Sequence, residues 1–206
     1  MKDARTLHVI NTDNGNHEKA MEQFHLALKV DPTNVTTYII LAKFNKVSGN
    51  IEESKRLVKL AYALNDLGVE DKTELLLIKA EIYKAEDNLE EAINYYKLAY
   101  NENNSITSIL AILDIKLVTE NYLEAIEWGT RAMDNRTQLD PSYLGHLLYN
   151  IGLAYRGAAS MYYDKAADVV NKINDGEKIH LVMKTESINN LKLSKGNFSK
   201  ARDYFL

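Results

Sequence analysis

The five histidines are the chain's first candidates for metal or acid–base chemistry. They are His8, His17, His25, His146 and His180. A hydrolytic zinc site places two histidines one helical turn apart beside a carboxylate, as in His-Glu-x-x-His, and none of the five makes that pattern. His17 and His25, eight residues apart, could share a helix face, but packing or surface roles fit them better. We therefore predict no metal site and no cofactor.

Two further patterns resemble parts of catalytic motifs. Gly152 and Gly157 have the spacing of a phosphate-binding loop, but the Lys and Ser/Thr that would contact phosphate and magnesium are missing. The pairs Glu52–Glu53 and Glu90–Glu91 stand at expected helix starts, where negative charge favours the helix dipole. We expect Gly152 at a close approach of two helices and Gly157 beside a turn before Tyr163. With no Gly-x-Ser-x-Gly elbow either, the sequence predicts no enzyme.

The chain has 13 tyrosines, which could form a stacking platform for bases or sugars. Many of them recur at positions expected to pack between helices, and core packing is the favoured role there. These packing positions are Tyr38, Tyr83, Tyr96 and Tyr155. The freer candidates for contact with a partner are Tyr95, Tyr100 and Tyr149.

Composition narrows the class of protein. In 206 residues, 46% are hydrophobic, which is enough for a sizeable core. The net charge is -4, and without a long basic tract nucleic acid binding is disfavoured. No apolar run approaches the roughly 18 residues that span a bilayer. The first residues lack the apolar segment of a secretory signal, so we predict a cytoplasmic protein without a membrane span.

A pattern of small residues recurs along the chain. An Asn is followed four positions later by a small residue, and the pairs are Asn16/Ala20, Asn50/Ser54, Asn88/Ala92, Asn121/Ala125 and Asn197/Ala201, with a variant at Tyr163/Ala166. Seven positions beyond the small residue come Ala27, Ala61, Ala99 and Ala132, with Ile173 as the fifth instance. Residues seven apart lie on one helix face, and small ones admit a neighbouring helix closely.

Each of these Asn residues is expected to begin a helix. Asn is a favoured N-cap, and a glutamate three residues later can reach back to the N–H of the cap. Such a glutamate is present at Glu53, Glu91 and Glu124. A glycine directly before the Asn, which fits the left-handed residue that ends a helix, is present at Gly15, Gly49 and Gly196. The sequence therefore predicts a repeated unit of helix, tight turn and helix.

The repeated unit resembles the tetratricopeptide repeat (TPR) family, whose pattern is Trp-x2-Leu-Gly-x2-Tyr, then Ala and Phe, then Pro. The matching segments are Leu148-x2-Ile151-Gly152-x2-Tyr155, Ala20-x3-Phe24-x2-Ala27-x4-Pro32 and Ala92-x3-Tyr96-x2-Ala99. The chain departs from the pattern at three points. Trp is missing from the first position of every repeat, Gly129 stands where an aromatic is expected, and two extra residues lie around Ala158 to Tyr162.

The resemblance implies an all-α fold, a right-handed superhelical solenoid of antiparallel helix pairs. About six repeats are expected in a single domain, 1–206, because stacked hairpins share one core. Their approximate ranges are 1–34, 35–68, 73–106, 107–140, 145–178 and 182–206, the last incomplete. The chain stops at Tyr204-Phe205-Leu206 inside a second helix, so we expect either a longer parent protein or self-association through this uncapped end.

In the TPR family the first helices line a concave groove, and some members grip a peptide's C-terminal carboxylate through Lys and Asn one turn apart. The aligned pairs here are Arg5/Val9, Ile39/Lys43, Leu77/Glu81, Leu110/Asp114, Tyr149/Leu153 and Glu186/Asn190, so this clamp is missing. One turn further along lie Lys46, Lys84, Leu117 and Arg156. We predict that the groove carries a ribbon of apolar contacts, bordered by residues of mixed charge. The ribbon consists of Ile39, Leu77, Leu110, Tyr149 and Leu153. Alternatively, some of these residues form ordinary core between helices, because a register error of one residue would turn them away from the groove.

These features favour a scaffold or adaptor whose groove binds a protein partner. The ribbon predicts recognition of an apolar or amphipathic segment through side-chain anchors, with weak salt dependence and no need for a free C-terminus. The alternative is a peptide-sensing regulatory module of a longer signalling or transcription regulator. A third class is a substrate-docking segment of an enzyme whose catalytic domain lies outside these residues.

Overall fold

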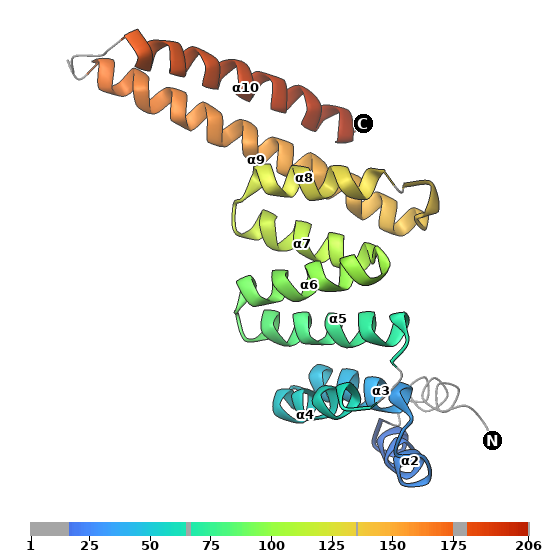
Figure 1. Ribbon diagram of the computed structural model, residues 1–206. Helices are drawn as coiled ribbons and strands as arrows, with labels where there is room; N and C mark the ends of the chain where they lie inside the picture. Colours follow the sequence, from blue (N-terminus) through green and yellow to red (C-terminus); the bar gives the residue numbers. More distant parts are fainter. Residues whose placement is uncertain (1–16, 65–66, 135, 175–180, 206) are drawn as a thin grey trace. The chain divides into compact units, whose positions relative to one another are not determined.

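The computed structural model describes residues 17–64, 67–134, 136–174 and 181–205 (Figure 1). Each element in this part of the chain is a helix, which confirms the all-α prediction. The elements are α2 His17–Val30, α3 Val35–Val47, α4 Ile51–Tyr62, α5 Val69–Ala85, α6 Leu89–Asn103, α7 Ile106–Val118, α8 Tyr122–Met133, the 3-10 helix η1 Arg136–Gln138, α9 Pro141–Asn174 and α10 Leu181–Phe205. The chain forms two compact units, Met1–Ser108 and Ile109–Leu206.

In the first unit, α3 packs against α4 and α5 packs against α6 as two helical hairpins (Figure 1). They span residues 35–62 and 69–103, so α5 begins four residues before the expected range 73–106. The recurring small residues of these two hairpins, Ser54, Ala61, Ala92 and Ala99, each have 0% exposure, as predicted, whereas Ala27 of α2 is half-buried. The Ser54 hydroxyl donates a hydrogen bond of 2.8 Å to the carbonyl oxygen of Ala42. A side chain this small lets α3 and α4 approach closely, and its hydroxyl is satisfied there.

The turn between α3 and α4 has the predicted form. The N–H of Asn50 donates to the carbonyl of Asn45 at 2.8 Å, and the N–H of Gly49 donates to that of Lys46 at 3.1 Å. These two bonds define a Schellman motif, which ends a helix on a residue in the left-handed region. Gly49 has φ +80°, a conformation that glycine adopts without a steric penalty.

Two further helices, α5 and α7, end in the same motif without a glycine. Their turn bonds are Asn88 to Tyr83 at 2.9 Å, Asp87 to Lys84 at 3.2 Å, Asn121 to Lys116 at 2.8 Å and Glu120 to Leu117 at 3.1 Å. The left-handed position is taken by Asp87, with φ 59°, and by Glu120, with φ 58°. The turn therefore forms even where the residue before the Asn has an unfavourable side chain for it.

Asn occupies the predicted N-cap of α4, α6 and α8, but its capping bond forms in only one of these helices. The Asn88 side chain accepts a hydrogen bond of 3.2 Å from the N–H of Glu91. The Asn50 and Asn121 side chains make no such bond. Asn34, at the start of α3, accepts from the N–H of Thr37 at 2.9 Å. The Asn positions mark the helix starts correctly, whereas the expected capping bond depends on the local turn.

In the second unit, α8 lies against α9, and two glycines set their separation. A Cβ atom on Gly129 would lie 2.5 Å from Cγ1 of Ile151, and one on Gly157 would lie 2.3 Å from Cε1 of Tyr122. Both distances are far below van der Waals contact, so a larger side chain would push the helices apart. This close packing gives a physical reason for glycine, rather than an aromatic, at position 129.

The predicted helix pairs in the last two repeats are wrong. We expected turns before Tyr163 and at Gly196–Asn197, but α9 runs unbroken for 34 residues and α10 for 25. The segment Ala158–Tyr162 holds no glycine or Asn, and its alanines favour a helix. Gly157 therefore lies within α9, beneath the Tyr122 ring, rather than beside a turn. The two helices pack along each other as one long hairpin (Figure 1).

Several sequence predictions fall on residues that the structure does not describe. The first helix of repeat 1–34 and the turn at Gly15–Asn16 lie outside the described residues, as do the side chains of Ala201 and of the terminal Tyr204-Phe205-Leu206. Self-association through that end therefore stays a prediction.

Candidate partner-binding surface

The predicted ribbon in the first unit is more polar than expected. Ile39 is buried, with 5% exposure, and Leu77 is half-buried. The predicted charged positions of α3 and α5 lie at this surface, and Lys43 pairs with Glu74 while Lys46 pairs with Glu81. Burial, followed by the nearby charges of Lys43 and Lys84, lowers the pKa of Lys46. Ion pairs between neighbouring first helices thus cross the face on which we expected apolar contacts.

The predicted ribbon in the second unit divides into buried and accessible positions. Leu110 is buried, with 5% exposure, whereas Tyr149 is 56% exposed. Asp114 accepts a hydrogen bond from the side-chain amide of Asn150, and its Oδ1 lies 3.4 Å from Nε2 of His146. These contacts join α7 to α9 and fix the register of the two helices that carry the ribbon in this unit.

Three of the predicted residues converge on a cleft beside these contacts, named here the α7–α9 cleft. Leu117 of α7 lines it together with Leu153 and Arg156 of α9. The remaining lining residues are Tyr122, Gly157 and Ser160, and the volume is about 450 Å³. The volume lies in the range of roughly 300–1,000 Å³ that is typical of ligand sites in proteins.

One face of α9 supplies most of this surface. Tyr149, Leu153, Arg156 and Ser160 follow one another at intervals of four, three and four residues, which places them on a single helix face. This stripe crosses positions 156 to 160 without interruption only because α9 is one continuous helix. The cleft therefore depends on the absence of the turn that we expected before Tyr163.

The sequence did not indicate the other half of the cleft. Tyr122 begins α8 and lies over Gly157, so a glycine in α9 and an aromatic in α8 form one wall together. Their spacing of 35 residues follows no periodicity of a single helix. The signal available in the sequence was a glycine within an apolar helix pattern, which often marks a close approach of another element.

The described residues contain no cluster of His, Asp and Glu side chains that could hold a metal ion. Glu53 pairs with Arg56 and Glu52 with Lys55, so the carboxylate pair at the start of α4 serves in ion pairs. No helix in the described ranges is long and apolar enough to cross a membrane. The lining of the α7–α9 cleft offers two leucines, the phenol of Tyr122, the hydroxyl of Ser160 and the guanidinium of Arg156.

Comparison with known proteins agrees with the repeat pattern. Residues 73–105, which cover α5 and α6, match the family model of the tetratricopeptide repeat. No curated protein sequence matches the chain.

Solved structures show the same fold. A crystal structure of MamA is 18% identical, with a TM-score of 0.56 over 98% of this chain and 94% of its own. BtubC from P. vanneervenii is also 18% identical, with a TM-score of 0.55 over 92% of this chain and 85% of its own. TPR-like repeats assigned to a kinesin light chain of Podosopora anserina are 13% identical, with a TM-score of 0.58 over 97% and 98%.

Proposed function

We propose that this chain, a tetratricopeptide-repeat solenoid by its fold, is a non-catalytic interaction module that binds an apolar or amphipathic segment of a partner protein in the α7–α9 cleft. TPR repeats generally mediate contacts between proteins, and the match at 73–105 supports that class of function here. The observation that carries the proposal is the convergence of Leu117, Leu153 and Arg156 on one cleft.

The cleft's chemistry defines the segment it would accept. Leu117, Leu153 and the Tyr122 ring offer apolar contact, which favours burial of an aliphatic or aromatic anchor. Arg156 is exposed at the same surface and can pair with a carboxylate on the polar side of that segment. Because the anchor is a side chain, neither a free C-terminus nor low salt is required for binding.

Not all of the predicted ribbon takes part in this proposal. Ile39 and Leu110 are each 5% exposed and have little surface to offer a partner. Lys43 of α3 is paired with Glu74 of α5, and Lys46 of α3 with Glu81 of α5. Leu77 and Lys84 are accessible in the first unit, but no cleft that we describe includes them. Tyr149 is 56% exposed and lies on the same face of α9, one helical turn before Leu153.

A display selection tests the proposal. We would select the purified chain against random peptides displayed within a protein loop, so that no peptide offers a free C-terminus, and measure the Kd of the enriched sequences. We expect apolar anchors at helical spacing, and binding that weakens less than about threefold between 50 and 500 mM NaCl, because apolar contacts are screened little by salt.

Matched variants locate the site. Leu153→Asp introduces a charge into the cleft and should weaken binding of the enriched peptides about tenfold or more, which corresponds to 1.4 kcal/mol or more. Val118→Asp makes the same kind of change on α7 at a side chain that is 80% exposed and outside the cleft, and should leave the Kd within about twofold. Equal affinity for the Leu153→Asp variant, with its fold verified by circular dichroism, would contradict the proposal.

A further inference from the structure

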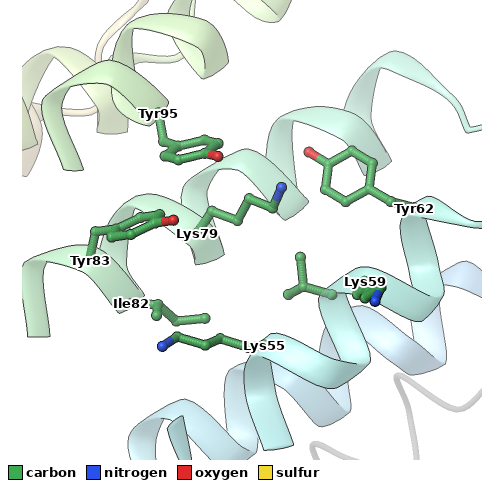
Figure 2. A pocket seen from close by; sticks show the side chains of 8 residues that line it. Lys55, Lys59, Tyr62, Lys79, Ile82, Tyr83 and Tyr95 are labelled. Atoms are coloured by element: carbon green, nitrogen blue, oxygen red, sulfur yellow. The ribbon is translucent and has the colours of Figure 1, made fainter. Parts of the chain in front are cut away.

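A second cleft lies in the first unit, between α4, α5 and α6 (Figure 2). Its volume is about 300 Å³. The lining residues are Lys55, Val58, Lys59, Tyr62, Lys79, Ile82, Tyr83 and Tyr95. On α5 the lining positions 79, 82 and 83 point away from the face that carries Leu77, Glu81 and Lys84, since they lie about half a turn around the helix. This tyrosine–lysine cleft is therefore separate from the predicted groove.

Aromatic rings form the walls of the tyrosine–lysine cleft. Tyr83 and Tyr95 stack with their ring centroids 5.3 Å apart and their planes 8° from parallel. The ammonium nitrogen of Lys79 lies 4.6 Å from the centroid of the Tyr62 ring and 5.1 Å from that of Tyr95. Stacking and cation–π contacts hold these groups in place. Figure 2 shows the Lys79 side chain between the rings of Tyr62 and Tyr95, so the cleft combines aromatic walls with a cation.

The charges that line the cleft have one sign. Its lining contains three side chains that are charged at neutral pH, and all three are lysines. Lys55 is compensated by Glu52 and Glu86. Within the described residues, Lys59 and Lys79 pair with no carboxylate. Burial lowers the pKa of Lys79, because the charged ammonium group is less well hydrated there.

The uncompensated lysines define the chemistry of a ligand. A carboxylate placed between Lys59 and Lys79 would gain two charge-assisted contacts in a partly desolvated site. An aromatic or aliphatic group attached to it would pack on the rings of Tyr83 and Tyr95 and on Ile82. The volume lies at the lower end of the range for ligand sites, which suits one or two side chains of a peptide rather than a whole domain.

We propose that the tyrosine–lysine cleft is a second binding site, specific for an acidic peptide segment in which a carboxylate side chain lies beside an aromatic one. Lys59 and Lys79 bind the carboxylate, and the tyrosines bind the aromatic ring. This site lies within the first unit and does not require the α7–α9 cleft. A partner with an acidic aromatic segment would be held here through charge and ring contacts, whereas the α7–α9 cleft selects an apolar anchor.

The test uses the purified full chain and a capped, fluorescein-labelled peptide in which Glu and Phe alternate three times. Fluorescence anisotropy at about 50 mM NaCl keeps electrostatic contacts strong. Two control peptides replace every Glu with Gln or every Phe with Gly. We expect each control to bind about tenfold more weakly than the Glu–Phe peptide, because each keeps only one of the two kinds of contact.

Variants of the chain assign the binding to the cleft. Lys59→Gln and Lys79→Gln should each weaken binding of the Glu–Phe peptide about fivefold or more. The exposed Lys72 lies on α5 outside the cleft, and Lys72→Gln should change the Kd less than about twofold. Because Lys79 also contacts two rings, the fold of the Lys79→Gln variant is checked by thermal unfolding. Lys59 is exposed, so Lys59→Gln tests the same site with less effect on the fold.

Three outcomes would overturn this proposal. They are an absence of binding, equal binding of the Glu–Gly peptide, which would indicate a general basic patch, and equal losses in the Lys59→Gln and Lys72→Gln variants. The Leu153→Asp variant should bind the Glu–Phe peptide as the wild type does. If Leu153→Asp weakens binding of the display-selected peptides but not of the Glu–Phe peptide, the two sites bind independently, and the two proposals can fail separately.

Discussion

Two hairpins of the molecule, α5–α6 and α9–α10, both pack one helix along the next, but they differ in the length of their helices. The first joins helices of 17 and 15 residues through a Schellman turn, whereas the second joins helices of 34 and 25 residues. Both regions contain the small residues that were expected to mark a repeat. The comparison teaches that small residues determine where helices touch, and that a separate signal determines where a helix ends.

The signal that ends a helix is weak in the α9–α10 hairpin. Between Ala158 and Tyr162 no residue readily adopts a positive φ, so α9 continues. At about 1.5 Å per residue, its 34 residues form a surface about 51 Å long. α10 packs along this surface, and a turn at Gly196 would take its last residues away from α9. Contact with α9 thus outweighs the glycine's small helical penalty of about 1 kcal/mol.

The largest expected effect comes from filling the close contacts in the short hairpins. Ala92 and Ala125 are fully buried, and Ala92→Leu or Ala125→Leu should lower the free energy of unfolding by about 1–3 kcal/mol through overpacking. Urea denaturation followed by circular dichroism gives this value. The exposed Ala85 of α5 serves as the control, since Ala85→Leu should change stability by less than about 0.5 kcal/mol. Unchanged urea denaturation midpoints for both Ala92→Leu and Ala125→Leu would contradict the proposed helix register.

Two glycines should respond to the same substitution with opposite signs. Gly49 has φ +80°, so Gly49→Ala should destabilise the chain by about 1 kcal/mol. Gly196 lies within α10 with no atom near a new Cβ, so Gly196→Ala should stabilise it by about 1 kcal/mol. Urea unfolding measures both. A destabilised Gly196→Ala variant would show that this glycine ends a helix, as the repeat pattern alone predicted.

Tyr62 allows a pH test in the first unit. Its hydroxyl is buried and has no hydrogen-bond partner among the residues that the structure describes. Burial, followed by the nearby Tyr95 and Glu102, raises its pKa to about 12. Tyr62→Phe should therefore stabilise the chain by about 1 kcal/mol at neutral pH, because it removes an unsatisfied buried group. Tyr38→Phe is the control and should destabilise it, since the Tyr38 hydroxyl donates to the Pro32 carbonyl at 3.2 Å.

The sign of the pH dependence follows from the raised pKa. The unfolded chain releases the Tyr62 proton near pH 10, whereas the folded chain keeps it until about pH 12. Between these values the folded state binds more protons, so wild-type stability falls as the pH rises. Tyr62→Phe does not have this loss of stability. Its free energy of unfolding in urea should therefore exceed that of the wild type by more at pH 11 than at pH 9. A constant advantage would contradict the raised pKa.

The smallest effect is expected where a short hairpin turns without glycine. Asp87 has φ 59° in the turn between α5 and α6. Asp87→Gly relieves about 1–2 kcal/mol of strain but increases the entropy of the unfolded chain, so a net gain of about 0.5 kcal/mol is expected. Asp71→Gly, at the first turn of α5 on the same hairpin, should instead lower stability, and the pair can be compared by thermal unfolding.

Much of the regular fold could be predicted from the sequence. The Asn positions and the small residues four positions later located the helix starts and the contacts at Ser54, Ala92 and Ala125, because both depend on local spacing. The long helices could not be predicted in this way. Their continuity results from contact between α9 and α10, and the same anchor at Gly196–Asn197 is compatible with a turn or a helix.

The candidate site was partly predictable for the same reason. Leu117, Leu153 and Arg156 follow helical periodicity, and the cleft contains all three. Tyr122 joins them only through packing on Gly157, which no sequence spacing indicates. In the tyrosine–lysine cleft, Tyr83 was assigned to packing and Tyr95 to contact. Both assignments were incomplete, because the two rings stack on each other at the wall of a cleft.

The most direct test of the account is the length of α9, because both the long hairpin and the α9 wall of the cleft require an unbroken helix. The chain has no cysteine, so Gly145→Cys and Asn171→Cys allow two spin labels to be attached specifically at exposed positions. Their 26 intervening steps predict a backbone separation of about 39 Å by double electron–electron resonance. A turn near Ala158–Tyr162 would place the two positions on two packed helices whose axes lie about 8–10 Å apart. A separation far below about 39 Å would therefore contradict the account.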